Sequence, residues 1–235
     1  MSPKPVAVPS SWFTSPAHRR WLESETDRLL DFGRRSMVPG GFARQRDDGA
    51  PADGPLELWI ACRMTHVYAL GTLLGRPGCA PLVDHGLRAI AQTFADPEHG
   101  GWFAAVQRDG SVTDEAKAAY PHAFVVLAAA SACAAGRPGA RTLLDSALAV
   151  SDKWFWDDDA GMVVEEWDRT FTTLDGYRGV NANMHTVEAY LAAADAMIGE
   201  AVAQGARLVA LPEYFPVIGD EKAKVRLREQ DGEGP

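Results

Sequence analysis

Cysteine is scarce in this chain of 235 residues. The three cysteines, Cys62, Cys79 and Cys133, are an odd number, lie far apart and form no CxxC pair. This pattern argues against a disulfide framework and contains no spacing typical of a zinc or redox site. We interpret the three thiols as small apolar side chains in a reducing compartment. We expect neither a metal nor a cofactor.

Long apolar runs are also lacking. The N-terminal sequence MSPKPVAVPSSWF has only three consecutive apolar residues before Pro9, far fewer than the core of a signal peptide needs. No other segment approaches the ~20 uninterrupted apolar residues that a membrane helix requires. We therefore expect no membrane contact and a cytoplasmic protein.

Positive charge is in short supply. The chain has 23 Lys and Arg against 32 Asp and Glu, a formal net charge of −9, and the basic residues are scattered along the sequence. Nucleic acid is therefore not an expected partner. Hydrophobic residues make up 46% of the chain, which is enough to fill a substantial core. The composition is that of a globular protein.

Six segments have the apolar spacing of helices. Ser15 is a candidate cap of the first helix, and Pro16 takes its first position. The expected helices span residues 16–35, 56–74, 80–94, 114–135, 138–155 and 182–198. Because convincing strands are few, the sequence predicts an all-α fold.

Three connections between these helices share a glycine followed by a large apolar residue. The pairs are Gly41–Phe42, Gly101–Trp102 and Gly161–Met162, and the glycines are 60 residues apart. A fixed period indicates a repeated unit, here two helices whose connection makes a short β-like excursion. Stacking such units makes an all-α solenoid or toroid. Glycines that only mark loops are the alternative.

The second expected helix carries polar and aromatic residues that an apolar context does not require. Trp59, Arg63 and His66 follow each other at steps of four and three, so they share one helical face. A half-buried arginine is costly unless it is paired. An ion pair with Glu57 or another carboxylate would be sufficient to explain Arg63.

The fourth and sixth helices carry similar residues. In the fourth, Tyr120 and His122 flank Pro121, which we expect to kink or break the helix. His122 alone is more typical of a hydrogen-bonded core histidine than of a functional one. In the sixth, Asn181 and His185 are four residues apart and so share a face.

An N-cap role would explain Asn181 and leave Asn183 as a tolerated first-turn residue. It would not explain His185, which has Met184 and Glu188 as neighbours on its stripe. If alternate helices form an inner wall, Trp, Arg, Tyr, Asn and His side chains converge there. Such a set suits a sugar, because an aromatic face stacks on the ring while amide, guanidinium and imidazole groups bond to hydroxyls.

Several motifs in order carry a family resemblance. They are LELWIACRMTHVYAL, DPEHGGWF, AAYPHAFVVLAAAS, FWDDDAGMVVEEW and GVNANMHTVEAYLAA. Together they resemble the N-acylglucosamine 2-epimerase superfamily, and within it the aldose–ketose isomerases acting on mannose or related sugars. The resemblance covers about residues 12–198. It implies an (α/α)6 barrel, a ring of six helical hairpins around a central active site, of which this chain holds about three.

The resemblance also implies roles for individual residues. Arg63 resembles the arginine that holds sugar oxygens, Trp59 an aromatic wall and Tyr120 a substrate contact. Asn181 and His185 resemble the amide and imidazole that bind hydroxyls and assist ring opening or proton transfer. The implied reaction moves a proton between the first two sugar carbons through an enediol, without a metal. Histidine suits such chemistry because its ordinary pKa is near working pH, and an arginine would stabilise enediolate charge.

The chain departs from the family in its second half. The family supplies its main acid and base from later helices, whereas no histidine follows His185 here and residues 199–235 diverge. We expect a flexible N-terminus (1–11), a hairpin domain (12–198) and a partly disordered C-terminal segment (199–235). Two accounts stay open. The chain is a fragment of a full-length isomerase, or it is a half-barrel whose second copy completes the ring as a homodimer, with His185 from both subunits in each site.

Two further functions stay open as alternatives. A non-catalytic sugar-binding or structural half-barrel would keep the sugar contacts of Arg63, Asn181 and His185 without turnover. An (α/α)6 glycoside hydrolase would need two facing carboxylates. Its candidates, Glu165, Glu166 and Asp168, are more typical of a solvated acidic edge.

Overall fold

The structure is a computed structural model in which residue 12 and residues 15–209 are described. Six α-helices dominate it, as the sequence predicts. They are α1 (Pro16–Arg34), α2 (Leu58–Leu73), α3 (Ala80–Arg88), α4 (Ala119–Ala134), α5 (Ala140–Val150) and α6 (Val180–Ala203). Helices α3 and α5 each continue into a π-helical turn, Ala89–Thr93 and Ser151–Phe155. The flexible segment expected at residues 1–11 and residues 210–235 of the divergent tail lie outside the described residues.

Short strands connect the helices. They are β1 (Met37–Val38), β2 (Gly41–Phe42), β3 (Leu56–Glu57), β4 (Ala105–Val106), β5 (Val112–Asp114), β6 (Lys117–Ala118), β7 (Trp156–Asp157), β8 (Met162–Val163) and β9 (Glu166–Trp167). All pairings are antiparallel and form the sets β1–β2, β3–β4–β5, β6–β9 and β7–β8. Residues 114–118, expected at the start of the fourth helix, are therefore largely strand.

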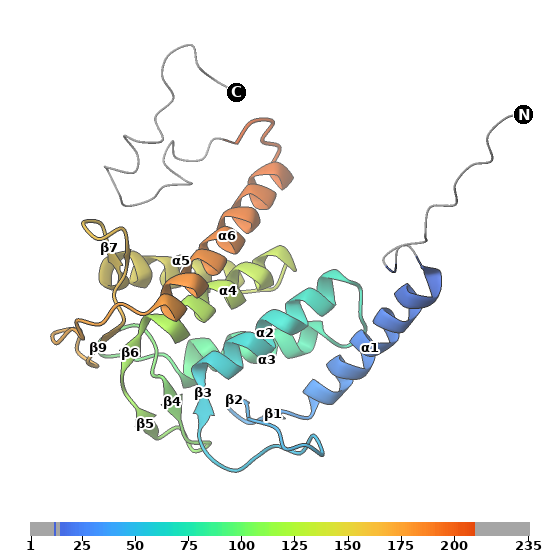
Figure 1. Ribbon diagram of the computed structural model, residues 1–235, viewed down its shortest axis with the longest axis horizontal. Coiled ribbons are helices and arrows are strands. Elements are labelled where there is room, and N and C mark those ends of the chain that lie inside the picture. Colours follow the sequence, from blue (N-terminus) through green and yellow to red (C-terminus); the bar gives the residue numbers. More distant parts are fainter. Residues whose placement is uncertain (1–11, 13–14, 210–235) are drawn as a thin grey trace, which may run out of the picture.

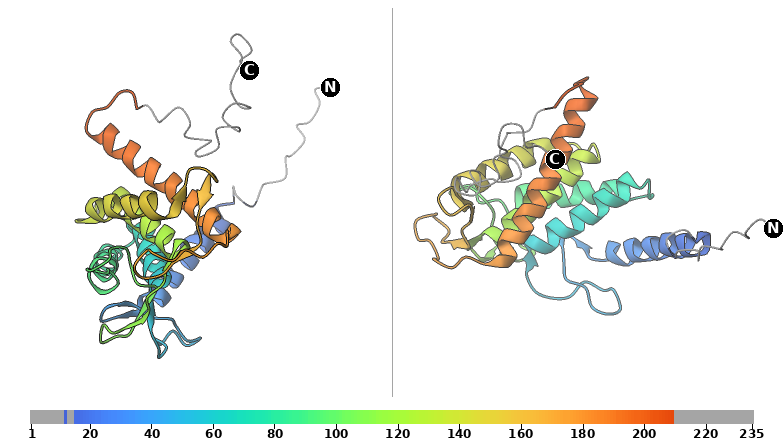
Figure 2. Two further views of the ribbon diagram at one scale, coloured as in Figure 1. Left: turned by 90° about the vertical axis from the view of Figure 1, so that its left-hand side faces the viewer. Right: turned by 45° about the horizontal axis from the view of Figure 1, so that its top comes forward.

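The helices alternate between two layers (Figure 1). Helices α2, α4 and α6 pack side by side, while α3 packs on α2 and α5 on α4. Helix α1 lies at the α2 edge of this array, away from α6 (Figure 2). Three hairpins result, each an outer helix followed by an inner one. The expected alternation of outer and inner helices is confirmed.

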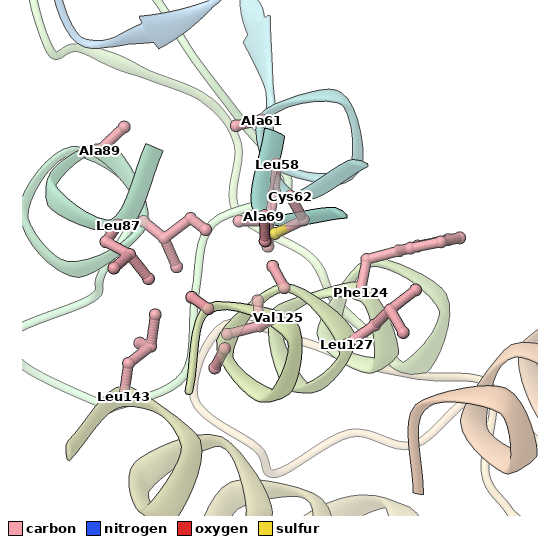
Figure 3. Packing of buried hydrophobic residues seen from close by; sticks show 14 of the residues in the cluster. Leu58, Ala61, Cys62, Ala69, Leu87, Ala89, Phe124, Val125, Leu127 and Leu143 are labelled. Atoms are coloured by element: carbon pink, nitrogen blue, oxygen red, sulfur yellow. The ribbon is translucent and has the colours of Figure 1, made fainter. Parts of the chain in front are cut away.

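Composition explains which helices are central. Every residue of α4 from Pro121 to Ala132 is buried, since its alanine-rich sequence lets neighbouring helices approach closely on all sides. The outer helices are amphipathic instead and bury one stripe each, such as Leu82 and Leu87 in α3. Figure 3 shows buried side chains of α2, α3, α4 and α5 packed together around Leu58, Leu87 and Val125. Each such large aliphatic side chain contributes about 1.5–3 kcal/mol by leaving water.

Two of the three cysteines belong to this core. Cys62 and Cys79 are buried, and Cys133 is half-buried. Burial raises the pKa of the Cys62 thiol. In the described part of the chain, no helix is both long and apolar enough to cross a membrane.

The expected repeat is present, with a corrected register. The inner helices begin at Leu58, Ala119 and Val180, each start 61 residues after the previous one. In the connections, Asp96 and Asp157 both cap a turn by accepting backbone N–H groups two and three residues ahead. The structurally equivalent glycines are therefore Gly100 and Gly161, not the Gly101 and Gly161 that a spacing of 60 aligns.

The same correction applies to the apolar residue of the repeat. Trp102 pairs with Ala95, and Val163 pairs with Trp156, so Val163 and not Met162 is the equivalent of Trp102. Val163 is buried and Met162 is exposed. The two turns have the same length and repeat at 61 residues, and the adjacent pair Gly100–Gly101 let a spacing of 60 align the wrong glycine. Strand pairing, and not glycine position, sets which side chain faces the core.

Strand pairing also fixes where the inner helices begin. Strand β3, just before α2, pairs with β4 of the following connection, and β6, just before α4, pairs with β9. The first amide of each helix continues the ladder, Leu58 to the Ala104 carbonyl and Ala119 to the Glu165 carbonyl. The N-terminal turns of α2 and α4 are thereby held at equivalent heights. Pro121 lies in the first turn of α4, so the expected kink is wrong: at that position the missing N–H has no helical acceptor to lose.

An ion-pair network centred on the buried Asp96 ties the second and third connections together. Lys117 donates to Asp96 at 3.0 Å, and both side chains are fully buried. Arg169 also donates to Asp96, with its Nε 3.0 Å from Oδ2. Burial alone would raise the pKa of Asp96, but hydrogen bonds from Arg169, the Glu98 backbone and Lys117 hold it well below its usual range. This network stabilises the rim from which the inner helices start.

Candidate functional site

The arginine of α2 lies against aromatic rings of its own helix and of α4. Arg63 donates from Nη2 to the Tyr120 hydroxyl at 3.1 Å. Its Cζ lies 4.4 Å from the ring centre of Phe124 and 5.2 Å from that of Trp59. Such contacts stabilise a half-buried cation by about 0.5–2 kcal/mol each. Among the described residues Arg63 forms no ion pair, so the carboxylate that the sequence left open as its partner is replaced by aromatic faces.

Glu57 has a different partner. Its carboxylate accepts two hydrogen bonds from Arg44, one of them at 2.8 Å, and one from the Trp59 indole N–H at 3.3 Å. The Arg44 guanidinium lies 5.5 Å from the Trp59 ring centre. Trp59 is thus half-buried against two arginines, which restricts how much of its ring is available for stacking.

His185 of α6 joins the same aromatic group. Its ring centre lies 5.4 Å from that of Tyr120 and 4.7 Å from that of Phe124. Its Nδ1 lies 2.7 Å from Oε2 of Glu188, one turn further along α6. Since an ionised carboxylate only accepts, Nδ1 carries the proton and donates, which leaves Nε2 with a free lone pair in the neutral ring. We call Trp59, Arg63, Tyr120, Phe124 and His185 the inner-face cluster.

These residues occupy equivalent repeat positions. Arg63, Phe124 and His185 are each the sixth residue of their inner helix, and Trp59 and Tyr120 are each the second. Asn181 is the second residue of α6, so it lies at the height of Trp59 and Tyr120. The sequence contained this regularity, but only the helix starts reveal it.

Asn181 is exposed, and within the described residues its side chain forms no hydrogen bond. The cap explanation for it is wrong, because α6 begins at Val180 and its N-cap is Gly179. Asn183 has the structural role instead. Its side chain accepts the Val163 N–H at 2.8 Å and donates to the Gly179 carbonyl at 2.9 Å. Asn183 thus fixes the start of α6 to β8, a role that the sequence reading missed.

The two other inner histidines have different environments. His122 is buried; its Nε2 accepts the Trp102 N–H at 3.2 Å, and its Nδ1 donates to the Ala118 carbonyl at 2.7 Å. Burial lowers the pKa of His122 to about 3. It is the hydrogen-bonded core histidine that the sequence favours. His66 is half-buried, and its Nδ1 lies 2.7 Å from Oγ of Ser131 on α4.

The candidate carboxylates lie in the third connection. Glu165 accepts the Gly179 N–H at 2.9 Å, and Asp168 accepts the Thr172 N–H at 2.8 Å. Burial, followed by the charges of nearby acids, raises the pKa of Glu166. These contacts order the loop that leads into α6. Among the described residues, no group of three or more His, Cys, Asp or Glu side chains is placed to hold a metal ion.

Comparison with known families agrees with this architecture. The sequence profile of N-acylglucosamine 2-epimerase (GlcNAc 2-epimerase) matches residues 40–210. The chain belongs to this family. The expected fold class, about half of an (α/α)6 barrel, is likewise confirmed. A crystal structure of D-mannose isomerase superposes with a TM-score of 0.72 at 27% identity, over 77% of this chain and 47% of that one.

Curated relatives give the same assignment. The chain is 52% identical over 187 residues to a D-mannose isomerase of Thermobifida fusca, a match that covers 79% of this chain and 46% of that protein. It is 44% identical over 187 residues to a D-mannose isomerase of Pseudomonas cannabina pv. alisalensis, covering 79% and 45%. This family member therefore spans about half the length of the curated relatives it matches.

Proposed function

We propose that this chain contributes to an aldose–ketose isomerase acting on mannose-type monosaccharides through an enediol. The observation that carries the proposal is the packing of Arg63 and His185 on one ring, Phe124, which joins a fixed cation to an imidazole. The 52% identity to a D-mannose isomerase supports the sugar class. A role in carbohydrate metabolism and a cytoplasmic location belong to the same proposal.

The chemistry needs a base, an acid and charge stabilisation. A base removes the proton from C2 of the open-chain aldose, and the C–H electrons form the C1–C2 double bond while O1 becomes an enediolate oxygen. Arg63 would stabilise this developing charge. Protonation of O1, return of a proton to C1 and loss of the O2 proton then give the ketose. His185, with Nδ1 held by Glu188, has Nε2 available to carry a proton in ring opening or transfer.

The remaining candidates would bind the sugar without reacting. Tyr120 holds the Arg63 guanidinium and is half-buried, so its hydroxyl can also contact a sugar oxygen. Asn181 has its amide uncommitted within the described residues. Trp59 would form an aromatic edge of the site. No cofactor is required by this scheme.

The exposed side of α6, at the edge of the array, supports a second copy of this chain as a partner. Helix α6 exposes a stripe of large apolar residues, Val180, Met184, Val187, Leu191 and Met197. Residues 178–179 occupy the position of β3 and β6 but, within the described residues, pair with no strand. We propose that a second copy covers this edge and completes the ring as a homodimer. A chain that is monomeric by light scattering contradicts this and favours the account of a fragment of a longer isomerase.

Two other functions make different predictions. A non-catalytic half-barrel binds sugar saturably without proton exchange. A glycoside hydrolase is disfavoured because Glu165 and Asp168 are engaged with backbone N–H groups of the loop.

The deciding experiment is proton exchange at C2 of D-mannose, and at C1 of fructose, in D2O by NMR, with the mass of the sample checked by light scattering. Exchange that disappears in His185→Ala supports isomerase chemistry. Saturable binding of D-mannose without exchange supports the binding half-barrel. If the chain shows no binding of D-mannose and no proton exchange, the proposed function for this chain is contradicted.

A further inference from the structure

His66 lies one helical turn beyond Arg63 on α2, about 4.5 Å further along the helix axis. It is the ninth residue of its inner helix, and Glu188 is the ninth residue of α6. His66 and Glu188 therefore form a second tier, about one helical turn further along the inner helices than the tier of Arg63 and His185. In agreement with this, the charge of Glu188 acts on His66.

The contacts of Ser131 fix the proton positions on His66. Ser131 Oγ lies 2.7 Å from His66 Nδ1 and 2.9 Å from the Leu127 carbonyl. The carbonyl can only accept, so the single hydroxyl proton goes to Leu127, and Nδ1–H of His66 must donate to Oγ for both contacts to be hydrogen bonds. The neutral ring then has its lone pair at Nε2.

This lone pair is unused by the fold. Within the described residues Nε2 of His66 has no hydrogen-bond partner, and the ring is only half-buried. Burial lowers the pKa of His66, and the Glu188 charge opposes that shift without reversing it. His66 therefore offers a neutral imidazole, with Nε2 as its acceptor atom, next to the inner-face cluster. A sugar hydroxyl is a donor that such an atom can bind.

We propose that His66 is a further substrate-binding residue, whose Nε2 accepts a hydrogen bond from a hydroxyl of the monosaccharide in the tier behind Arg63. This inference rests on the proposed function. It adds a geometric requirement: Ser131 holds the tautomer, so His66 accepts from the sugar and does not donate to it. A purely structural His66 would need only the Nδ1 side that joins α2 to α4.

Two amide variants separate the two sides of the ring. In His66→Asn, the amide nitrogen lies near the position of Nδ1 and can still donate to Ser131, but nothing replaces Nε2. In His66→Gln, the amide reaches the position of Nε2. Binding of D-mannose to the full chain is measured for each by protein-observed NMR titration, together with the circular-dichroism melting curve. We expect His66→Asn to bind about tenfold more weakly with an unchanged fold, and His66→Gln to bind within about threefold of wild type.

The tautomer has its own spectroscopic readout. Long-range 1H–15N NMR of the histidine rings should show His66 with a protonated Nδ1 and a bare Nε2 in wild type. Ser131→Ala should produce a mixture of tautomers and weaken D-mannose binding. Ser146 is the matched control, because it makes the same bond to the carbonyl four residues back without a histidine. Ser146→Ala should change neither.

The outcomes separate this inference from the proposed function. If wild type binds D-mannose and His66→Asn binds equally well, the role of His66 is overturned while the proposed function stands. A protonated Nε2 in wild type overturns the role of His66 as well. If wild type binds no D-mannose, both are overturned.

Discussion

Arg63 and His185 contact the same ring from two different helices. The Arg63 Cζ lies 4.4 Å, and the His185 ring centre 4.7 Å, from the ring centre of Phe124. All three residues occupy the sixth position of successive inner helices. The repeat thus places an arginine, an aromatic spacer and a histidine at one height on the inner helices of the array. Each unit keeps the helix and varies the side chain at its sixth position.

Replacing Arg63 tests the cation of this group. Arg63→Ala should weaken D-mannose binding at least tenfold, because a fixed guanidinium would be lost from the sugar oxygens. The helical circular-dichroism signal should change little, since the arginine packs on aromatic surfaces without a buried ion pair. Arg141→Ala, on the outer helix α5, is the matched control and should bind as wild type does. Unfolding of Arg63→Ala would mean that Arg63 is a structural residue instead.

Glu188 should position His185. Glu188→Gln keeps the size of the side chain but removes the charge that fixes Nδ1–H. We expect proton exchange at C2 to slow about tenfold, with a small change in KM, because ring orientation matters more to proton transfer than to binding. Glu200→Gln, on the same helix but paired with Arg141, is the control. Equal rates for wild type and Glu188→Gln would remove Glu188 from the mechanism.

Neighbouring glycines separate backbone strain from packing. Both Gly100 and Gly101 have positive φ, 77° and 66°. A Cβ at Gly100 meets nothing within 4 Å, whereas one at Gly101 lies 2.9 Å from His122 Nε2. Gly100→Ala should cost about 1 kcal/mol of unfolding free energy and Gly101→Ala about 3 kcal/mol, by chemical denaturation. Equal costs would show that the turn, and not the packing on His122, sets the requirement for glycine.

The buried His122 should make stability depend on pH. Its pKa is lowered to about 3 in the folded state, against about 6.5 in the unfolded chain. The stability it contributes is therefore present above pH 6.5 and is lost as the pH falls toward 3, at about 1.4 kcal/mol per pH unit. Denaturation at pH 7.5 and 5.5 measures this difference. His122→Gln should show a smaller difference, and an undiminished one would assign the pH dependence to other groups.

The buried pair Lys117–Asp96 should tolerate little change. Lys117→Met leaves Arg169 as the remaining cation on Asp96 within the described residues, and we expect a loss of about 3 kcal/mol. Arg169→Met, whose side chain is partly exposed, should cost less. Denaturant unfolding of both variants gives the comparison, and a larger loss for Arg169→Met would place the main stabilising contact at the surface end of the network.

Local signals in the sequence were enough to predict the six helices and the alternation of outer and inner helices. Pro16 and the apolar spacing within each segment predict helices because both are local properties of the chain. The glycine repeat predicted the unit but misplaced its register by one residue at Met162, where strand pairing decides which side chain is buried. The kink expected at Pro121 failed for a similar reason, since the strand β6 delays the start of α4.

The sequence by itself determined the class of the fold, the family and the residue types of the candidate site. Periodicity and short motifs are local, so they can be read without coordinates. The tertiary structure alone decided the partners: Arg63 contacts Phe124 and Tyr120 and not a carboxylate, Asn183 holds the start of α6, and His66 donates to Ser131. Apart from the bond from Asn183 to Gly179, those contacts join residues at least 20 positions apart. Their geometry depends on the equal height of α2 and α4, which backbone hydrogen bonds fix, and on the side-chain bonds of Asn183 that place α6.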